Sequence, residues 1–316
     1  MICNFEHNRK SFGDYLRRLR KKSGLTQTSV IELAGVNHET LRKIEYGEVT
    51  PKIDTINKLS KVYNVDVLKA FSNCKYPKER VIQLILDEID RVSVLDKIDE
   101  LDHSCLLLND FIKDNKNELD EEIFIKIQQI NSLIQVIRIK NKTDKMNVTQ
   151  AEIFALEGIR LRHPSFEYNK MSNTIFTIIE LRLLISLAFS RSRLDKDEQS
   201  IQILKGVIEN LQYHIEYNIN VMTYLIQTYY MLSYVYYINA FYTLSVSMCD
   251  KGIHYSNKIY NSKLLPHLYF RRAVSKKALN LKDYHDDFDL SISAVKLQGD
   301  LQLLETFKEN ISKFHD

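Results

Sequence analysis

The sequence predicts an all-α protein, with a small N-terminal domain of five short helices followed by a long helical repeat. Glycine and proline are scarce, with 8 Gly and 4 Pro among 316 residues, and neither occurs from 78 to 157. A β-rich domain would need many more turn residues. Apolar residues instead recur at helical spacing through most of the chain. The length fits about two domains.

The five short helices are expected within residues 12–71. Gly24, Gly35 and Gly47 break the apolar pattern between successive helices. Thr50 followed by Pro51 predicts the start of the next helix, because a hydroxyl can cap a helix and proline is tolerated at its first position. Short helices joined by turns of a few residues with glycine are typical of a helix-turn-helix.

Three strings in this segment are the most specific, namely GLTQ at 24–27, LAGV at 33–36 and KIEYG at 43–47. Through them the segment resembles the Cro/C1-type (XRE) helix-turn-helix family. The resemblance implies that residues 26–34 form the helix that crosses the DNA backbone. It also implies that residues 37–46 form the recognition helix, whose first residues reach base edges in the major groove.

The same resemblance implies roles for individual side chains. Gln27 matches a position where a glutamine binds a phosphate, and Arg20 and Glu45 match a partly buried salt bridge that we expect to be structural. Ile31 stands where the family usually has a small alanine at the crossing of the two helices. The alternative is a five-helix scaffold that has lost DNA binding. The predicted DNA-binding residues are Gln27, Thr28, Asn37, His38, Glu39, Thr40, Arg42 and Lys43.

Charge is distributed unevenly along the chain. Residues 1–72 contain 13 Lys and Arg against 8 Asp and Glu, whereas the remaining residues contain 31 against 33. The formal net charge of +3 therefore conceals a basic head on a slightly acidic body. Contacts with DNA phosphates need such a local excess of positive charge.

The rest of the chain is expected to be helical throughout. Residues 1–72 form the head, 73–77 a linker, 78–299 a helical domain and 300–316 a C-terminal capping helix. Paired helices with short turns over this length predict an α-helical solenoid. Breaks in the apolar pattern predict eleven helices, at 78–93, 97–114, 119–140, 148–162, 172–191, 196–216, 219–238, 241–259, 264–281, 284–298 and 300–314.

The clearest repeat signal lies near the C-terminus. Residues 268–300 resemble a tetratricopeptide (TPR) unit, in which a first helix ends near a Lys-Asp-Tyr turn, here 282–284, and a second carries a small residue, here Ala294. A degenerate copy covers about 227–252. The body is therefore expected to be a TPR-like solenoid.

Taken together, the two halves resemble the peptide-pheromone-responsive regulators of Gram-positive bacteria called the RRNPP group (Rgg-, PlcR- and PrgX-like proteins). These proteins share an XRE head, a linker and a degenerate TPR body that binds a short signalling peptide. The resemblance implies a cytoplasmic transcription regulator that acts in quorum sensing. The expected partners are a double-stranded DNA operator, a short, largely apolar peptide and a second copy of the chain. Two heads on a palindromic operator gain affinity and specificity.

The concave face of TPR-type solenoids is lined by the first helix of each pair. Asn and Gln amides there can satisfy a peptide backbone, tyrosines supply apolar walls with a polar tip, and Arg272 or Lys276 could take a C-terminal carboxylate. The alternative is that the tyrosine stripe is inter-helix core and the polar stripe a solvated face. The predicted peptide-binding residues are Gln128, Asn131, Gln135, Arg138, Gln227, Tyr230, Tyr234, Tyr237, Tyr269, Arg272 and Lys276.

The opposite face of the helix expected at 119–140 is apolar and should be buried. Its members are Ile123, Ile127, Ile130, Ile134 and Ile137.

Motifs of other chemistry are missing from the sequence. Cys3, Cys74, Cys105 and Cys249 lack metal-binding spacing and indicate reduced cytosolic thiols. Acidic residues within 285–289 are explained by the dipole of a helix N-terminus rather than by a metal. Phosphate-binding glycine loops, nucleophile elbows and zinc motifs are absent, so we expect no enzyme, metal site or cofactor. Neither a secretory signal nor a membrane span is expected.

Two other hypotheses fit the same sequence. The helical repeat could bind a protein partner, such as a signalling component or an antirepressor, instead of a small peptide. The chain could also be a phage-type lysogeny switch that uses the same chemistry.

Overall fold

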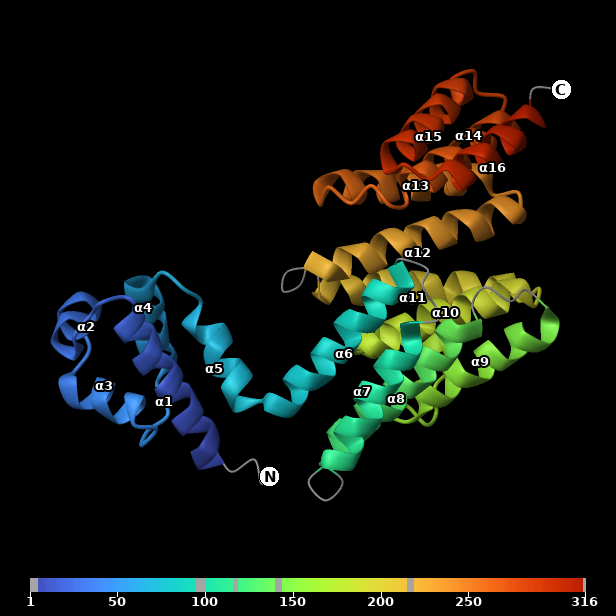
Figure 1. Cartoon of the computed structure of the whole chain (residues 1–316). Coiled ribbons are helices and arrows are strands. Elements are labelled where there is room, and N and C mark those ends of the chain that lie inside the picture. The colour runs from blue at the N-terminus through green and yellow to red at the C-terminus, as the bar shows by residue number, and fades with distance from the viewer. Residues whose placement is uncertain (1–4, 95–99, 116–118, 140–143, 215–218, 315–316) are drawn as a thin grey trace. The chain divides into compact units, whose positions relative to one another are not determined.

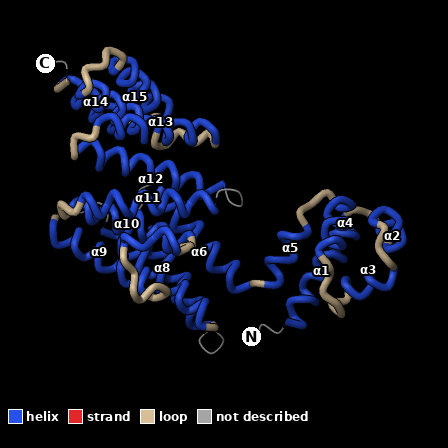
Figure 2. The backbone as a smooth tube through the Cα atoms, turned by 180° about the vertical axis from the view of Figure 1, so that it is seen from behind, coloured by secondary structure: helices blue, strands red, loops and turns tan. Residues whose placement is uncertain are grey.

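The computed structural model describes residues 5–94, 100–115, 119–139, 144–214 and 219–314. These residues form helices joined by turns and loops, and the described part of the chain contains no strand (Figures 1 and 2). The prediction of an all-α protein is therefore confirmed. The chain divides into two compact units, Met1–Phe124 and Ile125–Asp316, each with its own hydrophobic clusters.

The first unit begins with five short helices packed around one core. They are α1 (Phe5–Lys22), α2 (Gln27–Ala34), α3 (His38–Glu45), α4 (Ile53–Tyr63) and α5 (Val67–Lys75). Helix α1 packs against α3 and α5, while α2 packs against α3 and α4. The buried residues of this core are Phe12, Leu16, Val30, Ala34, Leu41, Ile44, Ile56, Leu59, Tyr63 and Val67.

The start of α4 differs from the prediction. Thr50 and Pro51 do not cap this helix, because Pro51 is buried and the chain stays extended as far as Lys52. Lys52 occupies the N-cap position without a side-chain cap, and the helix begins at Ile53. The helix therefore starts two residues later than the Thr50-Pro51 signal predicts.

Two further helices, α6 (Pro77–Val94) and α7 (Leu101–Asp114), belong to the first unit and pack against each other. Residues 73–124 thus group with the head in the structure. The predicted start of the helix at 97–114 falls on residues 95–99, which lie outside the described residues.

The second unit is a stack of helices (Figure 1). Helix α8 (Glu121–Ile139) spans the boundary between the units, and its predicted apolar face is buried as expected. The remaining elements are α9 (Lys145–Arg160), the 3-10 helix η2 (Tyr168–Asn173), α10 (Ile178–Arg193), α11 (Asp197–His214), α12 (Ile219–Ile238), α13 (Tyr242–Lys258), α14 (Leu265–Ala278), α15 (Tyr284–Gln298) and α16 (Leu301–Ser312).

Consecutive helices of this stack form antiparallel pairs, as a TPR-like repeat requires (Figures 1 and 2). Helix α12 also contacts both α10 and α14, whereas among the described residues no comparable contact joins α11 to α13 or α13 to α15. In a curved stack, the layer whose members touch one another lies on the inside of the curve. Helices α10, α12 and α14 are therefore called the inner layer below.

Small residues allow close approach between neighbouring helices of the stack. A Cβ on Gly252 of α13 would lie 2.8 Å from a methyl carbon of Leu268 in α14. Ser245 of α13 and Ser275 of α14 are fully buried, and their hydroxyl oxygens are 2.9 Å apart. These contacts make the predicted TPR-like units of 227–252 and 268–300 one continuous packed block.

The helix predicted at 172–191 begins six residues too early. Residues 172–177 instead end the 3-10 helix and continue as extended chain. Thr177 and Glu180 form a capping box, in which each side chain accepts a hydrogen bond from the backbone of the other, and this fixes the start of α10 at Ile178.

Candidate DNA-binding and peptide-binding sites

Capping side chains fix the first residues of both α2 and α3. The Thr26 side chain accepts a hydrogen bond from the Ser29 backbone N–H at 3.0 Å, and Asn37 accepts one from Glu39 N–H at 2.8 Å. Between the helices, Gly35 adopts a left-handed conformation with φ of 60°, which suits glycine. The first turn of α3 therefore projects from the domain with His38 and Glu39 exposed.

A buried carboxylate ties this helix pair to α1. Glu45 is 1% exposed and accepts two hydrogen bonds from the Arg20 guanidinium, at 2.6 and 2.9 Å. The Gln27 amide donates to the same carboxylate at 2.8 Å, and Arg17 donates to the Glu45 carbonyl at 2.9 Å. These hydrogen bonds, which Arg20 donates to Glu45, raise the pKa of Arg20. In this conformation the pair joins α1 to the end of α3, and its carboxylate also binds Gln27 at the start of α2.

A single glycine lets α1 approach α3 closely enough for this network. A Cβ on Gly13 would lie 2.6 Å from the carbonyl oxygens of both Ile44 and Glu45. Any side chain at this position would collide with the end of α3. Ile31, the departure from the family pattern, is half-buried and packs against the core of the head.

The exposed surface of α3 carries ion pairs of its own. Arg42 donates hydrogen bonds to Glu39 at 3.1 and 3.2 Å and to Glu48 at 3.2 and 3.3 Å, while the Lys43 ammonium lies 3.4 Å from Glu39. Hydrogen bonds from Arg42 and Lys43 lower the pKa of Glu39 to about 2. In this conformation the basic residues of α3 are partly neutralised within the helix itself.

The structure brings the predicted DNA-binding residues together on α2, α3 and the turn between them. Thr28, Asn37, His38 and Glu39 are exposed. Their neighbours Gln27, Thr40, Arg42 and Lys43 are half-buried on the same two helices.

The predicted residues on α8 form a half-buried stripe opposite its buried isoleucines. The stripe comprises Gln128, Asn131, Gln135 and Arg138. Neighbouring Gln129 is fully buried, and its amide donates to the buried Glu180 carboxylate at 2.9 Å and to the Gly158 carbonyl at 3.2 Å. Gln129 is thus a structural amide that joins α8 to α9 and α10.

The predicted stripe on α12 lies on the inner layer but is not uniform. Gln227 is exposed, whereas the three tyrosines are half-buried. The Tyr230 ring packs edge-on against His267 of α14 at 5.8 Å, and the Tyr237 ring lies 5.7 Å from that of Tyr242. Part of the stripe therefore belongs to the contact between helices, as the alternative interpretation expected, while Gln227 faces solvent.

Arg272 and Lys276, the predicted carboxylate partners, are already paired within the protein. Arg272 donates to the buried Asp287 at 2.5 and 2.9 Å and to Asp250 at 2.6 Å. Lys276 lies 2.7 Å from Asp283 and 2.9 Å from Asp287. Burial alone would lower the pKa values of both cations, but the hydrogen bonds that they donate to these carboxylates raise them.

Tyr269 lies beside this cluster, with the Arg272 guanidinium 5.3 Å from the centre of its ring. The residue that sequence reasoning missed is Arg271. Its guanidinium carbon lies 4.9 Å from the ring centre of Tyr234 and 4.8 Å from that of Tyr237, so it joins α14 to the predicted stripe on α12. No local signal marks it, because its partners are brought to it only by packing of the two helices.

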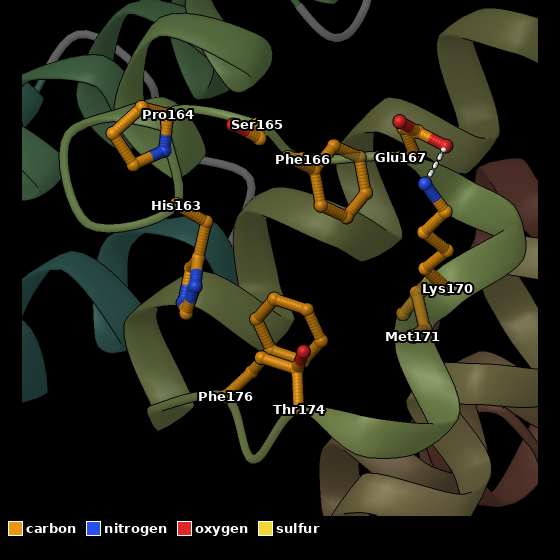
Figure 3. A pocket seen from close by; sticks show the side chains of 9 residues that line it. All are labelled: His163, Pro164, Ser165, Phe166, Glu167, Lys170, Met171, Thr174 and Phe176. Atoms are coloured by element: carbon orange, nitrogen blue, oxygen red, sulfur yellow. Dashed lines mark ion pairs between the residues drawn. The ribbon is translucent and has the colours of Figure 1, made fainter.

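A hollow of about 240 Å³ lies in the connection between α9 and α10 (Figure 3). The Phe176 ring meets His163 at 4.9 Å and Phe166 at 6.1 Å, both edge-on. Lys170 and Glu167 form an ion pair of 2.9 Å at one side. All the residues that line the hollow belong to this single connection, and none was predicted as a site residue.

Within the described residues, no group of three or more His, Cys, Asp or Glu side chains is placed to hold a metal ion. Asp287, from the acidic segment 285–289, instead binds Arg272 and Lys276. None of the described helices combines the length and the apolarity needed to cross a membrane.

Comparison with known proteins identifies the head. Residues 11–69 match the family model of a helix-turn-helix domain. The HTH-type transcriptional regulators PuuR of Escherichia coli (strain K12) and of Shigella flexneri are each 34% identical over 77 residues, which is 24% of this chain and 42% of theirs. The chain thus spans less than half the length of these curated relatives.

Solved structures match the chain almost throughout. Bacillus thuringiensis PlcR, in complex with the peptide PapR7 and DNA, gives a TM-score of 0.68 at 16% identity and covers 95% of this chain and 98% of its own. ComR from S. thermophilus, solved with DNA and its signalling peptide ComS, gives 0.56 at 12% identity with the same coverage. The SHP pheromone receptor Rgg2 of Streptococcus dysgalactiae gives 0.56 at 14% identity and covers 96% and 99%.

These likenesses confirm, at the level of fold, the resemblance seen in the sequence. The chain carries a helix-turn-helix domain over residues 11–69 and shares the fold of the RRNPP regulators PlcR, ComR and Rgg2.

Proposed function

We propose that this chain is a transcription regulator that binds operator DNA through its head and is controlled by a short, largely apolar signalling peptide. Residues 1–72 contact DNA, and residues 78–299 bind the peptide and form the dimer, with 73–77 between them and 300–316 as a cap. The observation that carries the proposal is the likeness to PlcR over 95% of the chain, because that protein was solved with both a peptide and DNA.

DNA binding is supported by the exposed first turn of α3 and by the basic charge of the head. His38 and Glu39 are exposed at the end of the helix that would enter the major groove. One small head offers few base contacts, so we propose that the chain forms a homodimer on a palindromic operator. We place the protein in the cytoplasm, where the DNA lies. Two half-sites about one helical turn apart, or a multiple of it, would fit two heads.

Peptide binding is supported by the polar and aromatic side chains along α8, α12 and α14. Exposed Gln227 can pair with a peptide backbone through both its donor and its acceptor. Half-buried tyrosines beside it offer apolar walls. To regulate DNA binding, the peptide must bind two arrangements of the repeat with unequal affinity.

The DNA half of the proposal is tested by fluorescence anisotropy with DNA from upstream of the gene. His38→Ala and Lys43→Ala should each weaken specific binding by about 1–3 kcal/mol, the usual contribution of a base contact. Lys61→Ala, which removes an exposed cation from α4, is the matched control. Unchanged operator affinity in both α3 variants would exclude α3 as the recognition helix.

The peptide half is tested by calorimetry with synthetic peptides from the C-terminus of a small reading frame beside the gene. The double variant Tyr234→Ala with Gln227→Ala should bind the active peptide more weakly while its circular dichroism stays unchanged. Loss of helix in that variant would assign the stripe to the core. Binding of a whole protein from the same neighbourhood, without any peptide binding, would favour the protein-partner hypothesis.

A further inference from the structure

Three cations lie close together on α14, and they differ in whether the protein already neutralises them. Arg272 and Lys276 share the carboxylates of Asp250, Asp283 and Asp287. None of the ion pairs among the described residues includes Arg271, although it is adjacent to Arg272 in the sequence. The difference arises because neighbouring residues of a helix point about 100° apart.

Arg271 is half-buried between aromatic rings rather than in open solvent. Its guanidinium carbon lies 4.9 and 4.8 Å from the ring centres of Tyr234 and Tyr237, and its Nε atom is buried without a hydrogen-bond partner. Cation–π contacts compensate only part of the cost of removing such a charge from water. The remaining cost is recovered when an anion pairs with the guanidinium.

The other polar groups around Arg271 do not supply that anion. Burial raises the pKa of the Tyr230 phenol, so this group stays neutral, although Arg271 opposes the shift. Burial and the charge of Arg271 both lower the pKa of His267, which keeps the imidazole neutral at pH 7. The guanidinium therefore faces two neutral polar groups and two rings.

The position of this cluster matches that of a ligand site. Arg271 joins α14 to α12 within the inner layer, and the tyrosines that it contacts belong to the same stripe as the exposed Gln227. From this geometry we infer that Arg271, framed by Tyr230, Tyr234 and Tyr237, is a carboxylate subsite, and that the ligand of the inner layer is an apolar peptide with a carboxylate. This inference rests on the proposed peptide-binding function and specifies the chemistry of its ligand.

The carboxylate can come from the C-terminus of the peptide or from an Asp or Glu side chain, and both give the same bidentate pairing with arginine. The probe is therefore a library of seven-residue apolar peptides in three forms. One form has a C-terminal amide and no acidic residue, the second has a free C-terminal acid, and the third has an amide and one Asp or Glu. The library is passed over immobilised full-length protein, and the retained peptides are counted by mass spectrometry.

The wild-type protein should retain one of the acid-bearing forms about tenfold or more over the neutral amides, the effect expected of a charge-assisted hydrogen bond. Arg271→Gln should abolish that preference. Arg160→Gln, which removes an exposed arginine from the end of α9, should leave it unchanged. The form that is preferred identifies the source of the carboxylate.

Two results would overturn the subsite while leaving peptide binding intact. One is equal retention of neutral and acidic peptides by the wild-type protein, a result that can be interpreted without any variant. The other is an acid preference that survives Arg271→Gln, since the carboxylate must then bind elsewhere. Retention of no peptide in any form would overturn the proposed function and this inference with it.

Discussion

The head and the repeat each contain an arginine that forms two hydrogen bonds with a buried carboxylate from another helix. In the head, Arg20 of α1 binds Glu45 of α3, which is 1% exposed. In the repeat, Arg272 of α14 binds Asp287 of α15, which is 2% exposed. Both pairs fix the crossing of two helices.

The two pairs differ in their effect on the neighbouring site. Glu45 also accepts a hydrogen bond from Gln27, so the structural carboxylate of the head positions a predicted DNA contact. Asp287 instead forms ion pairs with both Arg272 and Lys276. These two predicted ligand contacts are therefore already neutralised by the protein. A cation that already pairs with a buried carboxylate, as Arg272 and Lys276 pair with Asp287, is less available to a ligand than one whose partner is exposed, as Lys43 with Glu39.

The largest expected effect is that of Glu45→Ala. It would leave Arg20 without its carboxylate partner, and breaking a buried pair in this way typically costs about 3–5 kcal/mol of stability. Hydrogen exchange of backbone amides in α1 and α3 measures the local loss. The matched control is Glu32→Ala, an exposed glutamate on α2 that should have almost no effect. Equal protection in both variants would show that Glu45 does not hold the head together.

A somewhat smaller effect is expected for Asp287→Ala in the repeat. This change leaves Arg272 and Lys276 without their shared carboxylate, but Asp250 and Asp283 still neutralise part of the charge. We expect a loss of about 2–4 kcal/mol, below the range for a fully orphaned buried ion. Thermal unfolding followed by circular dichroism shows whether the stability falls or rises. The variant Asp289→Ala, at an exposed position, is the control. A rise in stability would mean that the buried ion pair destabilises the folded protein.

Gly13→Ala tests the close approach on which the network of the head depends. The new Cβ would overlap the carbonyl oxygens of Ile44 and Glu45, and overpacking of this kind costs about 1–3 kcal/mol. Hydrogen exchange should show weaker protection across α1 and α3, with Asp14→Ala at the adjacent exposed position as reference. Unchanged protection would mean that α1 can move away from α3 at no cost.

The smallest effect concerns the exposed ion pairs of α3. The pKa of Glu39 is lowered from 4.5 to about 2, chiefly by its hydrogen bond with Arg42. A lowered pKa means that the stabilisation is present above pH 4.5 and is lost as the pH falls from there towards 2. The chemical shift of the Glu39 carboxylate in NMR should titrate with a midpoint near this low value. In Arg42→Ala that midpoint should move to a higher pH. A midpoint near 4.5 in the wild type would contradict the pairing.

Local sequence signals predicted the helix-turn-helix well. Thr26 and Asn37, the predicted first residues of these two helices, are their N-caps in the structure, because capping needs only atoms within three residues. Thr50 and Pro51 carry an equally good local signal, yet Pro51 is buried and the helix starts two residues later, at Ile53. Tertiary packing prevailed over the local preference at that point.

The pairing of helices in the repeat was also predictable from periodicity, but the carboxylate subsite proposed at Arg271 was not. Arg271 and Arg272 are adjacent and chemically identical, and only the arrival of Asp250 and Asp287 from α13 and α15 distinguishes them. The early start predicted for the helix at 172–191 has a different cause, because the Thr177–Glu180 capping box that fixes the true start is a local signal that the prediction missed. Which side chains become partners depends on contacts that no local window contains.

The central claim is that peptide binding in the repeat changes DNA binding by the head. The most direct test measures the operator affinity of the full-length protein by fluorescence anisotropy, first without peptide and then at a saturating concentration of the peptide that binds it. We predict a change in affinity of about fivefold or more, the usual size of a coupling between two sites. An identical operator affinity at saturating peptide would contradict the claim, because a ligand that binds both states equally cannot regulate either.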